Sequence, residues 1–238
     1  MKLKRLLSVL DVCECTADPE LDVRDISFDS RTTQPGDLFA AVCGYESDGH
    51  RFIGAAVARG AAVVLCQKKP EVDIPYILVA DSRLALSRIC CEFFGNPSRE
   101  LTMIGVTGTN GKTTVTTLIK QTLEQAGCKA GLIGTIHTEI DAMDVPAKYT
   151  TPEPWDLNAL FSRMVLAGCT FAVMEASSQA LDQLRLYGLQ FEVGVFTNLT
   201  QDHLDYHKTV ENYLKAKKKF FDDMPKSAFS LTNLDDKN

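Results

Sequence analysis

The run from Gly105 to Thr114, with the sequence GVTGTNGKTT, most constrains how this chain can fold. A short apolar segment, 101–106, leads into the glycines, and residues 115–126 follow with apolar side chains at helical spacing. A strand, a glycine-rich turn and a helix N-terminus together form a phosphate-binding loop, because the N–H groups of the turn and the helix dipole face the same anion. The run therefore predicts binding of ATP or GTP.

Two side chains of this loop have predicted roles. Lys112 is placed to reach the β- and γ-phosphates, and the Thr113 hydroxyl is placed to bind Mg²⁺. The usual pattern has a glycine five residues before Gly111, where this chain has Val106. Glycines recur instead at every third position, 105, 108 and 111. A glycine-rich turn with an unrelated lysine is the alternative, and the flanking strand and helix disfavour it.

The composition is that of a globular protein, with 45% apolar and 24% charged residues in a chain of 238, enough for two modest domains. A net charge of −6 argues against nucleic-acid binding as the main role. No apolar run approaches the roughly 18 residues of a membrane span, and the apolar core of the first ten residues is too short for a signal peptide. The eight cysteines form no C-x-x-C pair and show no metal-ligand spacing with histidine. Most lie in apolar segments, so we expect buried thiols and a cytoplasmic location.

A turn-rich stretch, GNPSRE at 95–100, divides the chain into two predicted domains, 1–99 and 100–238. In the first domain the pattern predicts strands at 37–42, 62–66 and 76–79 and helices at 50–59 and 83–94. In the second it predicts strands at 101–106, 130–134, 171–175, 193–197 and 228–231 and helices at 113–126, 156–167, 179–186 and 208–222. This order indicates an α/β protein in which a small α/β domain precedes a mostly parallel, doubly wound sheet. Ligands of such sheets bind at the carboxyl ends of the strands.

An acidic residue, Glu175, ends the apolar strand predicted at 171–175. A carboxylate at that place, beside the glycine-rich loop, is where enzymes with such loops hold Mg²⁺. A solvated carboxylate at a strand end is the alternative.

Two histidines, His203 and His207, lie four residues apart after the strand predicted at 193–197, with Asp202 and Asp205 between them. This spacing raises the possibility of zinc, but no third soft ligand lies nearby, and a phosphate site requires a hard cation with oxygen ligands. We therefore favour a contribution of His203 to a Mg²⁺ site. A polar, hydrogen-bonded loop is the alternative.

A lysine, Lys217, lies in the middle of the apolar face predicted for helix 208–222. The apolar members of that face are Val210, Tyr213, Leu214, Phe220 and Phe221, and the lysines that point elsewhere are Lys215, Lys218 and Lys219. A lysine on an apolar face either extends its amine to water or, when buried, has a lowered pKa. A neutral amine can react with CO₂ to give a carbamate, an anion that binds metals. From the spacing alone, we favour the first alternative, in which the amine of Lys217 extends to water.

Several motifs together resemble the Mur ligases. GVTGTNGKTT, the run YTTP at 149–152, MEASSQAL, TNLTQDHLDYH and the segment YLKAK at 213–217 occur in the order seen in that family, and the likeness runs from about residue 20 to the last residue. The early run DSRTTQPGDLFAAVCGYESDGHRFI is similar to the N-terminal domain of members that add the third peptide residue to the cell-wall precursor. Folylpolyglutamate synthases are related, but they have Gly-Ser after GTNGK and lack this N-terminal domain.

The resemblance implies a set of site residues. ATP would be held by Gly108, Thr109, Asn110, Gly111, Lys112, Thr113 and Thr114. Mg²⁺ would be held by Thr113, Glu175, His203 and a carbamylated Lys217, and the residues implied to be catalytic are Lys112, His203 and Lys217. The uridine nucleotide would contact Ser30, Tyr45, Glu46 and Ser47. The muramoyl peptide would contact Thr150, Thr151, Ser177, Gln183 and Arg185. Two positions depart from the family pattern, Tyr149 where some members have asparagine and Gln179 where histidine is common.

The resemblance also implies an activity. An ATP-dependent ligase of this kind adds meso-diaminopimelate or L-lysine to UDP-N-acetylmuramoyl-L-Ala-D-Glu through an acyl phosphate. The sequence stops partway through the family's central ATPase domain, so we expect a fragment that does not ligate alone. A non-catalytic module that binds nucleotide or UDP-sugar is an alternative function, as is a related ligase such as folylpolyglutamate synthase.

Overall fold

The computed structural model describes residues 1–45, 47–146 and 149–236. The chain forms two compact units, Met1–Gly95 and Asn96–Asn238. The junction lies in the turn-rich stretch 95–100, where Asn96 has a left-handed backbone with φ of 58° and the short helix η2 (Pro97–Glu100) begins. A left-handed residue followed by proline cannot continue a helix, which explains why the preceding helix ends here.

The first unit contains a five-stranded sheet in the order β1-β5-β4-β3-β2. Its strands are β1 (Val12–Cys15), β2 (Ile26–Ser27), β3 (Leu38–Ala40), β4 (Val63–Cys66) and β5 (Tyr76–Val79). Only β1 runs antiparallel to its neighbour. The helices are α1 (Leu3–Leu7), η1 (Gly49–Phe52), α2 (Ile53–Ala58) and α3 (Ser82–Phe93). The strands and helices predicted for this part are present, whereas α1, β1 and β2 were not predicted.

Helix α2 covers one face of this sheet through a cluster that includes Phe39, Ile53, Ala56 and Val64. Helix α3 begins at an N-cap, Asp81, whose carboxylate accepts hydrogen bonds from the N–H groups of residues 83 and 84. Burial of apolar side chains against the sheet therefore fixes the unit, and capping sets where its longest helix begins.

The second unit contains a seven-stranded sheet in the order β12-β11-β6-β10-β7-β8-β9. Its strands are β6 (Thr102–Thr107), β7 (Ala130–Ile133), β8 (Thr138–Ile140), β9 (Met143–Val145), β10 (Phe171–Glu175), β11 (Val193–Phe196) and β12 (Phe229–Thr232). The first five strands in the sheet order are parallel, and β8 and β9 add an antiparallel hairpin. The predicted mostly parallel sheet is confirmed, and the hairpin is an addition to it.

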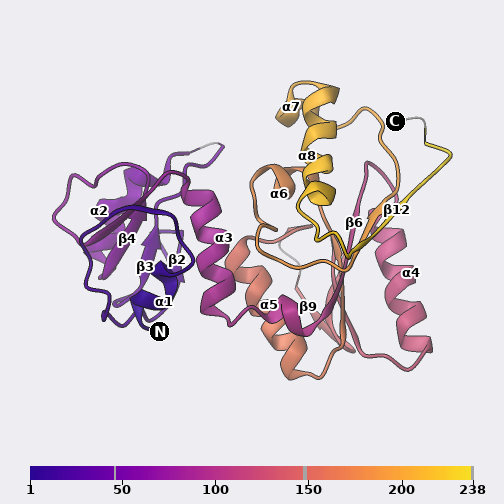
Figure 1. Cartoon of the computed structure of the whole chain (residues 1–238), viewed down its shortest axis with the longest axis horizontal. Coiled ribbons are helices and arrows are strands. Elements are labelled where there is room, and N and C mark those ends of the chain that lie inside the picture. Colours follow the sequence, from indigo (N-terminus) through magenta and orange to yellow (C-terminus); the bar gives the residue numbers. More distant parts are fainter. Residues whose placement is uncertain (46, 147–148, 237–238) are drawn as a thin grey trace. The chain divides into compact units, whose positions relative to one another are not determined.

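Both faces of the parallel strands are buried, because successive side chains of one strand enter different clusters. In β6, Met103 packs in the cluster that includes Phe161 of α5 (Pro154–Leu166), whereas Ile104 packs against Ile119 of α4 (Lys112–Gln125). Phe220 of α8 (Val210–Asp222) joins the first cluster. Figure 1 shows α4 on one side of the sheet and α5 and α8 on the other. The sheet is thus doubly wound.

Two predictions for the second unit need correction, and one helix was not predicted. The helix predicted at 179–186 is α6 (Ser178–Asp182), and Leu184 beyond it has a φ of 57°. The short helix α7 (Leu204–His207) was not predicted. Val210 and Leu214 are exposed, because the buried side of α8 consists of Tyr213, Ala216, Lys217 and Phe220. Helical periodicity predicts which residues share one face of a helix. It does not predict which part of that face packs against the rest of the protein.

The cysteines are less buried than expected. All eight are free thiols, of which Cys66, Cys90, Cys91 and Cys169 are buried. Cys13 and Cys15 are exposed because they lie on β1, an edge strand of the first unit. The expectation that most thiols are buried is therefore wrong. Among the described residues, no helix has the length and apolarity that crossing a membrane requires.

Candidate active site

The glycine-rich loop connects the end of β6 to the first residue of α4, Lys112. Gly111 caps the helix with a φ of 86°, and Gly108 has a φ of 146°. A Cβ atom at 108 would lie 2.0 Å from Thr197 Oγ1, so only glycine fits there. The loop is held from the other side by Asn198, which accepts hydrogen bonds from the N–H groups of Thr109 (2.9 Å) and residue 110 (3.0 Å).

Gly105 has a different role from the other two glycines of the run. It lies inside β6, where a Cβ atom would come within 2.3 Å of Phe220 Cζ on α8. The glycine therefore allows α8 to pack closely on the sheet and forms no part of the loop itself. At the position where the usual pattern has a glycine, Val106 is a fully buried residue of β6.

Two lysine side chains meet at one carbonyl oxygen of the loop. Lys112 Nζ donates to the oxygens of Gly108 (2.9 Å) and Thr109 (3.0 Å), and Lys217 Nζ donates to the same Gly108 oxygen at 2.8 Å. Lys217 is 2% exposed, and its amine lies 4.6 Å from the centre of the Tyr213 ring. It therefore does not extend to water.

Burial and the neighbouring Lys112 charge lower the pKa of Lys217 to about 7. Burial also lowers the pKa of Lys112. Near neutral pH a substantial fraction of Lys217 is thus a neutral amine, which is the reactive form.

A buried hydroxyl pair joins α8 to the loop. Tyr213 is fully buried and donates from its hydroxyl to Thr109 Oγ1 at 3.1 Å. The same Thr109 oxygen accepts from the N–H of Thr200 at 2.9 Å. These bonds fix the loop relative to the helix that carries Lys217.

At the carboxyl end of β10, Glu175 is 1% exposed and collects three hydrogen bonds. Its carboxylate accepts from the Thr113 hydroxyl (2.9 Å), the Thr135 N–H (2.9 Å) and the Thr135 hydroxyl (3.0 Å). Thr135 was not predicted from the sequence. The signal that could have found it is its place just after β7, since the carboxyl ends of neighbouring parallel strands lie together.

The two histidines have different surroundings. His203 has a φ of 52°, lies half exposed in the pocket, and its Nε2 is 3.7 Å from Asp202 Oδ2. His207 is buried, and its Nε2 is 2.9 Å from Ser178 Oγ. Burial lowers the pKa of His207. The two histidines do not share a site, and among the described residues neither belongs to a cluster of potential zinc ligands.

A polar wall continues from Glu175 toward α6. Thr151 donates to the backbone oxygen of Glu175 (2.8 Å) and accepts from the N–H of Ser177 (3.1 Å). Arg185 donates to the Thr151 oxygen (2.9 Å) and to Gln183 Oε1 (2.6 Å), and it forms an ion pair with Glu153 at 3.0 Å.

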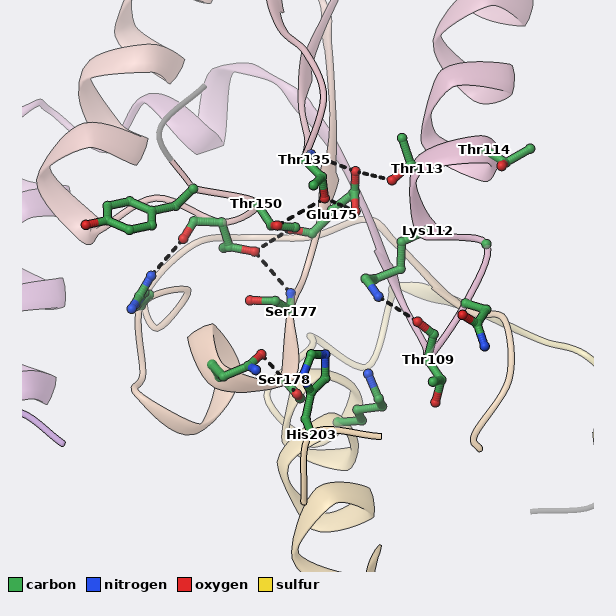
Figure 2. Close-up of a pocket in the computed structure, with 17 residues that line it drawn as sticks. Thr109, Lys112, Thr113, Thr114, Thr135, Thr150, Glu175, Ser177, Ser178 and His203 are labelled. Carbon is green, nitrogen blue, oxygen red and sulfur yellow. Dashed lines mark hydrogen bonds between the residues drawn. The ribbon is translucent and has the colours of Figure 1, made fainter. Parts of the chain in front are cut away.

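A cavity of about 600 Å³ lies between the loop and this wall. It is lined on the loop side by residues 109–114, Thr135, Glu175 and Lys217, and on the other side by residues 149–151, 177–179, Arg185 and His203. Figure 2 shows Thr113, Thr135 and Glu175 pointing toward one another, with Lys112 beside Thr109. Of the residues predicted for this unit, Gly108 and Gln183 are not among the lining residues; the Gly108 carbonyl oxygen accepts from the two lysines, and Gln183 Oε1 accepts from Arg185. Ser178 is a lining residue that the sequence did not reveal.

These groups suit a polyanion with a hard cation. Backbone N–H groups at the start of α4 and two amines supply positive charge, which phosphates require. The oxygens of Thr113 and Glu175 lie 2.9 Å apart, and oxygen ligands of this kind are those that Mg²⁺ prefers. The residues present therefore fit both groups.

The remaining predicted residues belong to the first unit. Ser30 is 8% exposed and follows β2, whereas Tyr45 and Ser47 lie on the exposed loop before η1. Glu46 lies outside the described residues. The Ser47 oxygen accepts from the N–H of Gly44 at 2.9 Å, and a Cβ atom at Gly44 would lie 2.7 Å from that oxygen.

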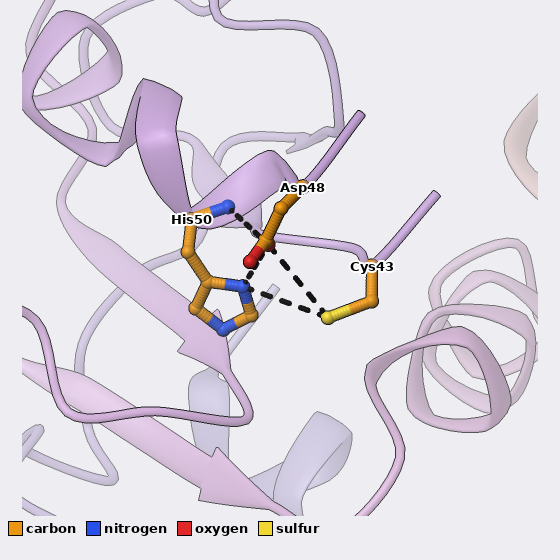
Figure 3. Close-up of side chains that lie close together, drawn as sticks. All are labelled: Cys43, Asp48 and His50. Atoms are coloured by element: carbon orange, nitrogen blue, oxygen red, sulfur yellow. Dashed lines mark hydrogen bonds and ion pairs between the residues drawn. The ribbon is translucent and has the colours of Figure 1, made fainter. Parts of the chain in front are cut away.

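In the same unit, Cys43, Asp48 and His50 bring potential metal-ligand atoms close together, a cluster that was not predicted from the sequence (Figure 3). His50 Nε2 accepts from the N–H of Gln67 at 2.9 Å, so the ring proton is on Nδ1, which donates to Asp48 Oδ1 at 2.6 Å. A metal would need the lone pair that this protonated Nδ1 lacks. Burial and the Asp48 charge also raise the pKa of the Cys43 thiol. The Asp48 and His50 contacts therefore hold the end of the loop 43–50 against the backbone at Gln67.

Comparison with known proteins gives matches over both units. A family model described as the Mur ligase middle domain matches residues 106–238, and one described as the Mur ligase family, catalytic domain, matches residues 22–93. The UDP-N-acetylmuramoyl-L-alanyl-D-glutamate–2,6-diaminopimelate ligase of Bacteroides fragilis is 51% identical over 100% of this chain and 50% of its own length. The ligase of the same name from Bacteroides thetaiotaomicron is 50% identical over the same shares.

A solved structure of a ligase with this name superimposes with a TM-score of 0.82 at 29% identity, over 100% of this chain and 48% of that one. The chain thus spans about half the length of the curated relatives it matches. Because the middle-domain match alone covers more than half of its residues, the chain belongs to the Mur ligase family.

Proposed function

We propose that this chain carries the nucleotide-binding and UDP-sugar-binding parts of an ATP-dependent carboxylate–amine ligase. The acyl substrate would be UDP-N-acetylmuramoyl-L-Ala-D-Glu, and the names of the relatives favour 2,6-diaminopimelate over L-lysine as the added amino acid. The observation that supports this most directly is the pocket in which the glycine-rich loop, two amines and the buried Glu175 meet. Both nucleotide substrates are cytoplasmic metabolites, so we propose action in the cytoplasm.

The glycine-rich loop, residues 108–114, would hold the phosphates of ATP. Lys112 and the N–H groups at the start of α4 would contact the β- and γ-phosphates. When bound, Mg²⁺ would neutralise charge on the phosphates, and it would be held by Thr113, Glu175, His203 and a carbamate on Lys217. The lowered pKa of Lys217 supports the carbamate, because the amine that attacks CO₂ must be neutral.

The chemistry would proceed in two steps. A D-glutamyl carboxylate oxygen attacks the γ-phosphorus, the bond to the β-phosphate oxygen breaks, and acyl phosphate and ADP result. The amine of the incoming amino acid then attacks the acyl carbon, phosphate leaves, the amine loses a proton, and an amide remains. Lys112 would stabilise the negative charge on the phosphoryl group during transfer, and exclusion of water by the pocket walls would protect the acyl phosphate.

The acyl substrate would extend across the polar wall. We assign its muramoyl-peptide part to Thr150, Thr151, Ser177, Gln183 and Arg185, and its uridine nucleotide to Ser30, Tyr45, Glu46 and Ser47. A module that binds these ligands without turnover is the alternative.

Isothermal titration calorimetry of the 238-residue chain with UDP-N-acetylmuramoyl-L-Ala-D-Glu tests the assignment. The titration is made with and without AMP-PNP and Mg²⁺. We expect binding that Ser30→Ala or Arg185→Ala weakens about tenfold, as loss of a charged or buried hydrogen bond does. Ser8→Ala and Arg163→Ala, both at exposed positions, are the matched controls. A folded sample that binds AMP-PNP but not the UDP-sugar peptide would overturn the cell-wall assignment.

A further inference from the structure

A chain of side-chain hydrogen bonds runs from the core to the pocket through α6. His207 Nε2 lies 2.9 Å from Ser178 Oγ, and Ser178 Oγ donates to Gln179 Oε1 at 3.3 Å. His207 is 5% exposed and Ser178 is 2% exposed, whereas Gln179 is half buried and lines the pocket. The chain therefore connects two buried groups to one that a ligand can reach.

The direction of these bonds follows from counting protons. A serine hydroxyl carries one proton, and Ser178 gives its proton to Gln179. Ser178 must then accept from His207, so the imidazole donates from Nε2. The carbonyl oxygen of Gln179 is engaged by Ser178, which leaves its amide NH₂ group to serve a ligand in the pocket.

Among the described residues that line the cavity on the side of Gln179, the basic side chains are those of Arg185 and His203. The charge of Arg185 is balanced by Glu153 at 3.0 Å, with both side chains largely buried. The loop side, in contrast, has the amines of Lys112 and Lys217. An anionic group that approaches the start of α6 would meet the neutral side chains of Ser177 and Gln179, beside an arginine whose charge is already balanced.

We propose that Gln179 contacts the acyl substrate and that its amide donates a hydrogen bond to a carboxylate oxygen of the D-glutamyl end. Ser178 and His207 are positioning residues that orient this amide. The proposal rests on the function proposed above and adds one ligand contact to it. Figure 2 shows Ser177, Ser178 and His203 on the side of the pocket away from Thr113 and Thr135.

A neutral donor suits a carboxylate that must act as a nucleophile. Hydrogen bonds to an ionised group are roughly twice as strong as those between neutral groups, so one amide is enough to orient the carboxylate. A cation in the same place would withdraw charge from the attacking oxygen more strongly. The amide therefore orients the carboxylate and leaves it reactive.

The test compares two probes that differ only in the D-glutamyl residue, UDP-N-acetylmuramoyl-L-Ala-D-Glu and UDP-N-acetylmuramoyl-L-Ala. Both are titrated calorimetrically into the whole chain with AMP-PNP and Mg²⁺ present. Gln179→Glu replaces the donor by an anion, so we expect at least a tenfold weaker affinity for the first probe and less than a twofold change for the second. Gln190→Glu makes the same change at an exposed position and is the matched control.

Each result has a distinct reading. If the unaltered chain binds neither probe, the proposed function fails. If it binds both and Gln179→Glu leaves the ratio of their affinities unchanged, the proposed function stands and the Gln179 contact is wrong. If Gln179→Glu weakens AMP-PNP instead, the amide faces the nucleotide phosphates, which also overturns the proposal.

A double-mutant cycle tests the positioning role of Ser178. We expect Gln179→Leu to weaken the D-glutamyl probe about tenfold and Ser178→Ala about threefold. The double variant should bind no more weakly than Gln179→Leu alone, because Ser178 acts only through the amide. Additive losses would show that Ser178 acts separately. Thermal melts followed by circular dichroism confirm that each variant is folded.

Discussion

Two clusters of this protein gather reactive side chains, and they differ in what those side chains have left to offer. At the base of the 43–50 loop, Asp48 and the ring of His50 are satisfied by each other and by backbone N–H groups. In the pocket of the second unit, two of the three donors of Lys112 are used by carbonyl oxygens, and Lys217 shares one of these oxygens. Metal-ligand or basic atoms that lie close together do not by themselves make a binding site. A binding site also needs side chains that still have donors or acceptors available for a ligand.

The electrostatics of the two clusters differ in the same way. The lowered pKa of Asp48, caused by hydrogen bonds from His50, belongs to a carboxylate that is already stabilised. The lowered pKa of Lys217 belongs to an amine whose charge is disfavoured by burial and by a second cation. An anion that enters the pocket would stabilise the charged form of Lys217. The Asp48 carboxylate is already stabilised by His50, so a ligand would add little there.

The largest expected effect is on nucleotide binding. Lys112→Ala removes the amine that would face the phosphates, and we expect the affinity for AMP-PNP with Mg²⁺ to fall about a hundredfold. Calorimetric titration measures it, with the exposed Lys215→Ala as the control. Unchanged affinity in Lys112→Ala would remove the contrast between the two clusters.

The next effect is on stability as a function of pH. Folded Lys217 releases its proton near pH 7, whereas the unfolded chain keeps it until about 10.5, so the stability of the unaltered protein rises with pH between these values. We expect Lys217→Met to be more stable near pH 7, by on the order of a few kcal/mol, and to lose this advantage as the pH approaches 10.5.

Urea denaturation in CO₂-free buffers measures the difference, because CO₂ would convert the neutral amine to a carbamate. Lys215→Met, at an exposed position on the same helix, should show no such pH dependence. A stability difference for Lys217→Met that stays constant over this range would show that the buried amine is not destabilised by its charge.

A smaller effect is expected in the first unit. Asp48 caps η1 and accepts from the ring of His50, so Asp48→Ala should lower the free energy of unfolding by about 1 kcal/mol. The affinity for AMP-PNP should not change. Urea denaturation and titration of the same sample test both, with the exposed Asp73→Ala as the control. A loss of nucleotide affinity in Asp48→Ala would contradict a role of Asp48 that is confined to the stability of the first unit.

For metal binding by Cys43, Asp48 and His50 we expect no effect at all. Because the protonated Nδ1 of His50 has no lone pair to give, titration with Co²⁺ should produce no thiolate charge-transfer absorption from this cluster. The spectra of the unaltered chain and of Cys43→Ala should coincide. An absorption band that disappears in Cys43→Ala would show that the cluster is a metal site after all.

The sequence predicted the parts of the fold that carry a repeated pattern. Strands buried on both faces read as apolar runs, and α4, α5 and α8 have helical spacing, so these elements and the loop at Lys112 were found. The hairpin of β8 and β9 was missed, because two strands of three residues joined through Asp141 at a φ of 54° are too short to show a period.

The site was predictable where a motif or a strand end marks it. Glu175 and Lys217 stand out in the sequence, one by its place after a strand and the other by its place on an apolar face. Thr135 and Ser178 do not, because a single hydroxyl residue in a loop or at a helix start has no pattern that separates it from a surface residue. Their roles depend on which distant residues fold against them, and that is a property of the assembled sheet.

The close approach of Phe220 to Gly105 has a consequence for how residues of this pocket would be discovered by mutation. Helix α8 carries Lys217, and Phe220 of this helix packs against β6 at Gly105, where the strand has a hydrogen atom in place of a side chain. A methyl group added at Gly105 would push that helix outward and withdraw the amine from the loop. A genetic screen for loss of nucleotide binding would therefore recover position 105 beside position 112, although residue 105 lies within a strand and does not line the cavity.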